Sequence, residues 1–337
     1  MRGSGRPVWE DETSADDLRA LDPGPPDAIP NAPDVLVVGG GAIGLAIAAM
    51  CTRRGMDVVL IERDRLAQSA SGRAAGGLAP DAHPQAGPQW HAFARRSLEL
   101  HRELNAEWRY GLEILDLRVV PDLVIENQAR VNPLTMAAAF VRNAGTVCTR
   151  VEATEWSDDY RRVTTTAGDI EPGAVVFATG TSGVIDTEQS FVKGHLIATE
   201  PAPFALGEIV ATVDSGFLCL QLPSGRIVAG GTKEPDDDTN DVIDDTVERI
   251  RTTLVEMLPQ ARDLAISHRW CCFRPKTSGE LPLIDRVSDR ALVAAGFYST
   301  GILMAPVVGA AIASWVHGDA PAGIGAFAVR RKASGLR

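Results

Sequence analysis

The sequence predicts an α/β protein in which a Rossmann-like dinucleotide-binding domain is joined to a second, mostly antiparallel β domain. Residues 34–62 have the pattern of a buried strand, a glycine-rich turn, a helix and a second buried strand. Between residues 191 and 232, short apolar runs alternate with turns, as in an antiparallel sheet. With 337 residues, of which 45% are hydrophobic, the chain is long enough to form two domains with buried cores.

The first elements are expected to form a βαβ unit. Asp34 to Val38 is a largely apolar run that ends in glycines, which is typical of a parallel strand buried on both faces. Ala42 to Arg54 is rich in Ala, Ile and Leu and stops at Gly55, so we expect a helix there. Asp57 to Glu62 has the pattern of a second buried strand, which completes the unit.

The turn between the first strand and the helix contains a GxGxxG motif formed by Gly39, Gly41 and Gly44. The first glycine permits a tight turn, the second lets the backbone approach a pyrophosphate, and the third allows close helix–strand packing. Phosphates would lie at the helix N-terminus, where free N–H groups and the helix dipole favour negative charge. Glu62 ends the second strand, where a carboxylate can bind ribose hydroxyls. The acid disfavours NADP, but this segment alone does not choose between FAD and NAD.

The remaining elements follow from the same patterns. Helices are predicted over residues 89–109, 132–143 and 242–258, and a last helix from about Pro306 to His317 after a strand at 291–296. Ala174 to Gly180 is expected to return to the nucleotide-binding sheet as a buried strand. The expected strands of the second domain are Val192 to Thr199, Ile209 to Val213, Leu218 to Leu222 and Ile227 to Ala229.

Residues 1–33 are predicted to be a mostly disordered N-terminal extension. Asp, Glu, Pro and Gly are frequent there, so little apolar surface is available to offset the entropy of the chain. A short helix over Ala15 to Leu21 is the one element expected, because Ser14 can cap it.

The segment from Gln68 to Pro80 consists mostly of small residues and follows Glu62, the carboxylate expected to bind the ribose. An extended FAD would need such a segment, along which the backbone can approach the cofactor. At this point the sequence resembles the D-amino acid oxidase family of flavoproteins, most closely its glycine oxidase branch. The matching segments are Val37 to Gly44, Glu62-Arg63, Ser71 to Pro80, Val131 to Pro133, Val176 to Gly180, Lys193 to His195, Arg274-Pro275 and Ala294 to Pro306.

The resemblance implies FAD as the cofactor, bound without a covalent link. It also implies an FAD-binding domain made of residues 34–80, 130–185 and 285–320, and a substrate domain made of 81–129 and 186–284. The cofactor-binding residues it implies are Gly39, Gly41, Ala42, Ile43, Gly44, Glu62, Arg63, Ser71, Ala75, Gly76, Gly77, Val151, Gly180, Ser299, Thr300, Gly301, Ile302 and Leu303.

In this family, a small amine or amino acid loses a hydride from the carbon beside nitrogen to flavin N5, and water hydrolyses the resulting imine. The resemblance assigns Arg274 to the substrate carboxylate, a task that suits a planar bidentate donor, whereas a structural ion pair is its alternative role. Leu218 stands where glycine oxidases carry a tyrosine that holds the carboxylate, and Ser299 replaces a second substrate-side arginine. The resemblance therefore does not extend to glycine itself as the substrate.

Other residues in the matching segments allow two interpretations of their role. Cys272 aligns with the cysteine that carries covalent flavin in sarcosine oxidases, although a buried inert cysteine is the commoner role. Lys193 and His195 are expected to be structural, with contact to the flavin ring as the alternative. Val228 occupies the position of the oxygen-activating lysine of sarcosine oxidases, so oxidase and dehydrogenase activity both stay open.

Composition narrows the expected partners. The net charge of −11 and the absence of a long basic run disfavour nucleic acid and membrane surfaces, and the five cysteines show no metal-ligand spacing. We expect a cytoplasmic enzyme with a small amine substrate and an electron acceptor, O2 being the first choice, and a homo-oligomer is compatible with the sequence. The alternatives are a flavin-dependent tailoring oxidase acting on a substrate that is not an amino acid, and a non-catalytic flavoprotein subunit.

Overall fold

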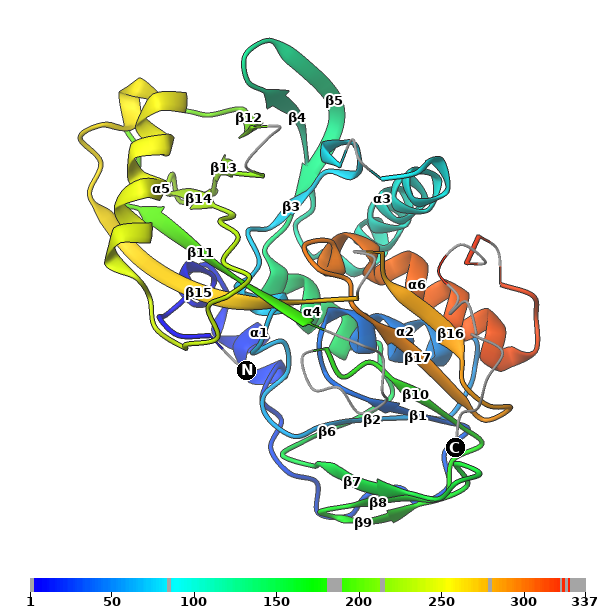
Figure 1. The fold of residues 1–337 in the computed structure, drawn as a ribbon. Coiled ribbons are helices and arrows are strands. Elements are labelled where there is room, and N and C mark those ends of the chain that lie inside the picture. The colour runs from blue at the N-terminus through cyan, green and yellow to red at the C-terminus, as the bar shows by residue number, and fades with distance from the viewer. Residues whose placement is uncertain are drawn as a thin grey trace.

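The computed structural model describes residues 3–83, 86–180, 190–212, 216–277, 281–321, 323–324 and 327. Two large sheets and one small sheet organise the chain, and the predicted fold class is confirmed (Figure 1). The helices are η1 (Val8–Glu10), α1 (Ala15–Ala20), α2 (Ala42–Arg53), η2 (Ser71–Arg73), η3 (Pro80–Ala82), α3 (Pro88–Trp108), α4 (Pro133–Val141), α5 (Asp244–Met257), η4 (Pro259–Ala261) and α6 (Gly301–His317). No helix among these residues is both long and apolar enough to cross a membrane.

The first large sheet, sheet A, has six strands in the order β16-β17-β10-β1-β2-β6. Its members are β1 (Val35–Val38), β2 (Val58–Glu62), β6 (Thr146–Thr149), β10 (Ala174–Phe177), β16 (Leu283–Arg286) and β17 (Ala291–Ala295). All pairs are parallel except β16 with β17, so the predicted βαβ start is confirmed. A three-stranded sheet covers one face, made of β7 (Ala153–Trp156), β8 (Val163–Thr165) and β9 (Gly168–Ile170).

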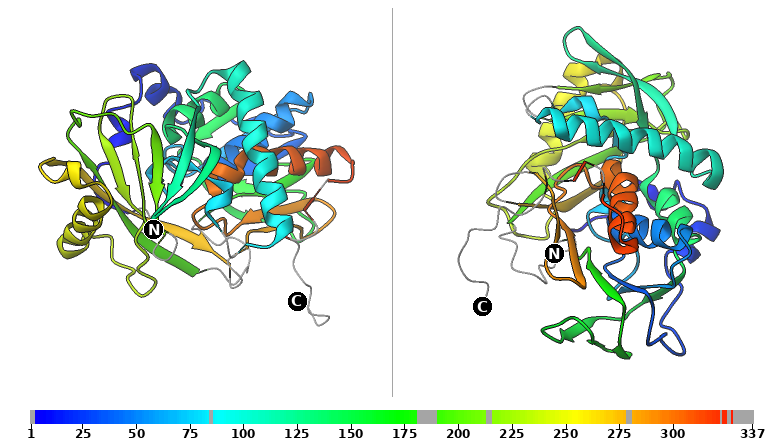
Figure 2. Two further views of the ribbon diagram at one scale, coloured as in Figure 1. Left: turned by 90° about the horizontal axis from the view of Figure 1, so that it is seen from above. Right: turned by 90° about the vertical axis from the view of Figure 1, so that its right-hand side faces the viewer.

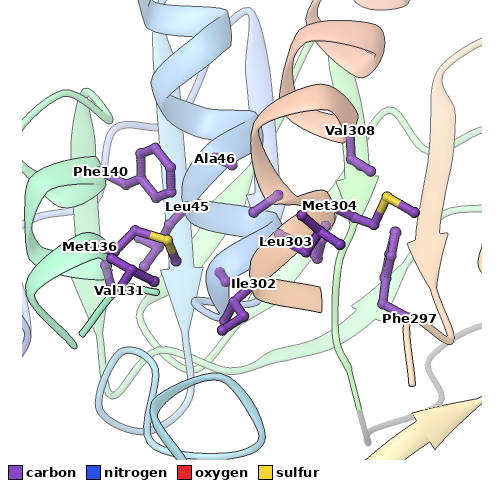
Figure 3. Packing of buried hydrophobic residues seen from close by; sticks show 14 of the residues in the cluster. Leu45, Ala46, Val131, Met136, Phe140, Phe297, Ile302, Leu303, Met304 and Val308 are labelled. Atoms are coloured by element: carbon purple, nitrogen blue, oxygen red, sulfur yellow. The ribbon is translucent and has the colours of Figure 1, made fainter. Parts of the chain in front are cut away.

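Helices α2, α4 and α6 pack together on the other face of sheet A. Their apolar side chains form one core, with Leu45, Met136, Phe140 and Val308 among its members (Figure 3). The two long helices α2 and α6 approach closely because Gly309 has no side chain: a Cβ there would lie 2.6 Å from the Ala46 carbonyl oxygen. This packing holds the start of α2 and the start of α6 in one rigid unit.

The second large sheet, sheet B, has eight strands in the order β15-β11-β14-β13-β12-β4-β5-β3. They are β3 (Gly77–Leu78), β4 (Glu113–Val119), β5 (Leu123–Arg130), β11 (Ser190–Thr199), β12 (Glu208–Ala211), β13 (Leu218–Gln221), β14 (Ile227–Gly230) and β15 (Ile266–Lys276). Only β12 and β4 pair in parallel. Helix α5 covers the outer face of sheet B, and the inner face is turned towards the core of sheet A and its helices (Figure 2).

Helix α6 begins at Gly301, so the prediction of a start near Pro306 is wrong. Proline has no N–H and leaves the carbonyl of Ile302 without its helical donor. His101 of α3 replaces that donor, because its Nε2 lies 2.9 Å from the Ile302 oxygen and a carbonyl can only accept. Ser97 donates to the Leu303 carbonyl over 2.6 Å and accepts from the Val307 N–H over 3.2 Å. Burial lowers the pKa of His101 to about 4, so the ring stays neutral.

The N-terminal segment also differs from expectation, because residues 3–33 pack on the protein instead of forming a disordered extension. Three apolar side chains, Val8, Trp9 and Leu21, are buried in the main core. Ser14 caps α1 as expected by accepting from the Asp17 N–H over 3.1 Å. A few well-spaced apolar residues therefore anchor a segment whose average composition is typical of disorder.

Replacing Trp9 by alanine should lower the free energy of unfolding by about 3–5 kcal/mol, because a large buried ring leaves a cavity. The side chain is 2% exposed, and its Nε1 donates to the Ala74 carbonyl over 2.8 Å. Urea unfolding of the purified protein measures the change. Trp9→Phe keeps most of the packing and loses only the hydrogen bond, so it should fall between wild type and Trp9→Ala. Equal stability of all three proteins would show that the segment does not contribute to the fold.

Candidate active site

The glycine-rich turn at the carboxyl end of β1 leaves no space for a side chain at Gly39 or Gly44. Gly39 has a φ of +114°, which favours glycine, and a Cβ there would lie 2.4 Å from the Ala178 carbonyl oxygen. A Cβ at Gly44 would lie 1.9 Å from the Gly39 oxygen. Gly41 forms the N-cap of α2, so bare backbone lies in front of the helix N-terminus. Gly39 and Gly44 therefore have close packing of the kind expected of a dinucleotide-binding turn, and Gly41 leaves the helix N-terminus open.

Hydrogen-bond donors and one carboxylate surround this turn. The Ala42 N–H donates to Ser71 Oγ over 3.0 Å, which brings the hydroxyl to the start of α2. Glu62 accepts from the Gly40 N–H over 2.7 Å and from the Asp64 N–H over 2.9 Å. A helix N-terminus with a hydroxyl beside it suits phosphates, and a carboxylate at the end of β2 suits ribose hydroxyls. These residues fit FAD.

Replacing Glu62 by glutamine should weaken FAD binding about tenfold or more, since hydrogen bonds to a charged acceptor are the stronger ones. Burial raises the pKa of Glu62 above its ordinary value, although its backbone hydrogen bonds oppose the shift. The carboxylate therefore protonates at a higher pH than an ordinary glutamate, and FAD affinity should fall as the solution becomes mildly acidic. Flavin fluorescence titrations of apoprotein at neutral and acidic pH measure both effects. An equal pH dependence in Glu62→Gln would contradict this role.

The other predicted cofactor residues lie in two further places. Ala75, Gly76 and Gly77 lead into β3, and the Trp9 ring packs so closely on Gly76 that a Cβ there would lie 2.9 Å from it. Thr300 to Leu303 lie at the start of α6. The Tyr298 N–H donates to the Pro275 carbonyl over 2.7 Å, which joins the loop before α6 to the residue after Arg274.

The last four predicted cofactor residues are Val151, Arg63, Gly180 and Ser299, and their surroundings differ. Val151 is buried next to Glu62, since its N–H donates to the Glu62 backbone carbonyl over 3.0 Å. Arg63 lies near the carboxylates of Asp64 and Glu152. Gly180 has a φ of +58° with open space around its Cα, and Ser299 is exposed.

Arg274 lies on the inner face of sheet B. In the β11–β15 pairing it is opposite Val192, and its guanidinium covers Gly194, where a Cβ would lie 2.4 Å from both terminal nitrogens. One of these nitrogens donates to the Thr232 carbonyl over 2.8 Å. Within the part of the chain that the structure describes, no carboxylate pairs with this half-buried cation. The guanidinium is thus available to an anion that enters between the two sheets.

The neighbours of Arg274 divide between the two faces of sheet B. Lys193 and His195 point to the outer face, where Lys193 Nζ lies 2.8 Å from Asp237 and His195 Nδ1 lies 3.3 Å from Glu234. This geometry supports their structural interpretation. Cys272 shares the inner face with Arg274, but burial raises the pKa of its thiol, which disfavours the thiolate needed for a flavin link.

Leu218 also lies on the inner face, because its side chain would contact a Cβ at Gly77 at 3.9 Å. It therefore presents an apolar surface beside the expected cofactor track, at the position where relatives were expected to place a tyrosine. Sequence reasoning did not single out Trp9, Ser97 or His101, which support the two segments that lead into the site. The proline inside the apolar run of α6 was the one signal that could have pointed to Ser97 and His101.

The family model described as "FAD dependent oxidoreductase" (DAO) matches residues 34–119 and 109–315 of this chain. The chain is 26% identical over 348 residues to the glycine oxidase of Bacillus licheniformis, which covers 85% of this chain and 93% of that protein. The glycine oxidase structure from Geobacillus kaustophilus has a TM-score of 0.81 at 22% identity and covers 90% of this chain and 100% of that one. The L-proline dehydrogenase of P. horikoshii has a TM-score of 0.77 at 19% identity, covering 86% and 94%. These structures share the fold.

Proposed function

Because this chain belongs to the family of FAD-dependent oxidoreductases, we propose that it oxidises the C–N bond of a small amine that carries a carboxylate. The family and the FAD cofactor are those that the sequence predicted. The observation that carries the proposal is Arg274, a half-buried guanidinium on the inner face of sheet B with no acidic partner among the described residues. An unpaired, partly desolvated cation is costly unless an anion binds to it during function.

When bound, FAD supplies the two-electron acceptor that takes a hydride from the carbon beside the amine nitrogen. The residues of the chain position the substrate and the cofactor. Arg274 holds the substrate carboxylate through two parallel hydrogen bonds and so fixes which carbon approaches the start of α6. Gly39 to Gly44, Ser71 and Glu62 would hold the dinucleotide. The amine that has lost a hydride is a protonated imine, which leaves and is hydrolysed by water.

The decisive experiment adds glycine, sarcosine, proline, and D- and L-amino acids in turn to the purified yellow protein under anaerobic conditions. Loss of the visible flavin absorbance with one or more of them supports amine oxidation. A protein that dithionite bleaches but that none of these amines bleaches would refute the proposal and favour a non-catalytic flavoprotein. Hydrogen peroxide formed on admission of air identifies O2 as the electron acceptor, whereas turnover that needs an added dye identifies a dehydrogenase.

A second candidate is a flavin-dependent tailoring oxidase whose substrate has no free carboxylate. The apolar Leu218 on the inner face and the exposed Ser299 favour it, because Leu218 has no hydroxyl to replace that of a tyrosine and Ser299 lacks the positive charge of an arginine. The two candidates differ in their need for Arg274, so the activity of an Arg274→Ala variant distinguishes them.

A further inference from the structure

A second cation lies on the same inner face as Arg274. Residues 232–234 continue along β11: the Glu234 N–H donates to the Lys193 carbonyl over 2.9 Å, and the Lys193 N–H donates to the Glu234 carbonyl over 3.2 Å. Thr232 Oγ1 lies 3.1 Å from Glu234 Oε2, so both of these side chains point to the outer face. Since side chains alternate along an extended segment, Lys233 between them points to the inner face.

The backbone brings Lys233 next to Arg274. The Thr232 carbonyl that accepts from the Arg274 guanidinium belongs to the peptide group joining Thr232 to Lys233. Sequence proximity does not explain this pairing, because it depends on the strand order of sheet B, in which β11 lies between β15 and β14. Two cations therefore share one side of the sheet, in a protein whose net charge is −11.

Among the described residues, Lys233 has no partner of its own. It is exposed, and it makes no ion pair or hydrogen bond with any other residue for which the structure gives a position. An added Cβ at Gly216, just before β13, would lie 3.3 Å from Lys233 Cε and 3.5 Å from its Nζ. Glycine carries no charge, so this neighbour does not compensate the ammonium.

The segment after β3 carries a histidine that Lys233 influences. Desolvation lowers the pKa of His83 to about 4, and the positive charges of His91 and Lys233 contribute to the shift. Lys233 is therefore close enough to His83, which directly follows η3, for its charge to act on the imidazole. A neutral imidazole there can donate a hydrogen bond to an anion without adding a third positive charge.

We propose that Arg274 and Lys233 together bind a substrate with two acidic groups, so that the preferred amines are those that carry two carboxylates. This inference rests on the proposed function and narrows its substrate class. Arg274 holds the carboxylate next to the reacting carbon, and Lys233, a point charge on a flexible stem, meets the second one. Two neighbouring cations repel each other when unoccupied, and a dianion removes that repulsion.

The test compares diacids with matched monoacids on the FAD-containing enzyme: iminodiacetate with sarcosine, aspartate with alanine, and glutamate with 2-aminobutyrate, using both enantiomers where they exist. Anaerobic flavin reduction gives kcat/KM for each amine. We expect the diacid of the preferred pair to exceed its monoacid about tenfold or more, as for a hydrogen bond to a charged group. Lys233→Ala should bring this ratio close to one, and Lys233→Arg should retain most of it.

Arg251→Ala is the matched control, because it removes one positive charge from an exposed position of α5, on the outer side of sheet B. The diacid to monoacid ratio should be unchanged in this variant. A ratio near one in the wild type, or a ratio that survives Lys233→Ala, would overturn the inference even if amines bleach the flavin.

A binding measurement separates failure of the inference from failure of the proposed function. Malonate, succinate and glutarate are titrated against acetate, propionate and butyrate, and the shift of the flavin spectrum gives each Kd. Tighter binding of dicarboxylates that depends on Lys233 supports the two-cation site. If no amine is oxidised while this preference is present, the proposed function fails and the anion site stands.

Discussion

Replacing Arg274 by alanine is expected to lower kcat/KM for the carboxylated amine roughly 30-fold to several thousand-fold. This corresponds to a loss of about 2–5 kcal/mol of transition-state stabilisation. The reason is the desolvated carboxylate, which would lose its bidentate partner, while within the protein the variant loses one hydrogen bond to the Thr232 carbonyl. Arg274→Lys keeps the charge but loses the planar fork, so its activity should lie between those of the wild type and Arg274→Ala. Steady-state kinetics with the best amine measures all three.

Arg269→Ala provides the control for this experiment, because the same residue type lies on the same strand but on the opposite face. Arg269 pairs with Asp244 near the start of α5, and its side chain is 56% exposed. We expect kcat/KM to change less than twofold, since an exposed ion pair contributes about 1 kcal/mol or less to stability and nothing to binding. Full activity of Arg274→Ala would instead favour a substrate without a carboxylate.

Replacing Gly44 by alanine should abolish FAD binding and destabilise the protein by about 3 kcal/mol or more, because a backbone carbonyl cannot move aside as a side chain can. The added Cβ would lie 1.9 Å from the Gly39 oxygen, so either the turn or the start of α2 must shift. The FAD content of the purified protein and its urea midpoint measure the two effects. A yellow Gly44→Ala protein with the wild-type midpoint would rule out the turn described for the dinucleotide site.

Alanine substitutions at two further glycines are expected to have smaller effects than Gly44→Ala. At Gly207 nothing lies within 4 Å of an added Cβ, so Gly207→Ala should match the wild type in both measurements. At Gly41 the nearest atom is Ser71 Oγ at 3.3 Å, and a hydroxyl can rotate away. We therefore expect Gly41→Ala to fold with nearly normal stability but to bind FAD more weakly, because the methyl group lies where the pyrophosphate approaches. This variant separates cofactor binding from folding.

The elements that the sequence predicted well are those whose signals are local. The strands of the βαβ start and the helices α2, α3, α4 and α5 agree with their predicted ranges to within about two residues, because periodicity and capping residues are written along the chain. The same holds for the glycine turn and Glu62, whose mutual spacing is set by one strand, one helix and the next strand. The last helix is the exception, because Pro306, which the pattern predicts as its start, lies inside a helix that begins at Gly301.

The sequence by itself therefore determined the fold class, the family, the FAD cofactor and the arginine expected to meet the substrate. Only the tertiary structure decided what depends on contacts between distant segments. Trp9 is anchored by packing on Gly76, α6 continues through Pro306 because Ser97 and His101 of α3 supply the missing hydrogen bonds, and Lys233 joins Arg274 because β11 lies between their strands. The physical reason is that burial and pairing are set by the strand order and the packing of the whole chain, which local patterns along the sequence do not contain.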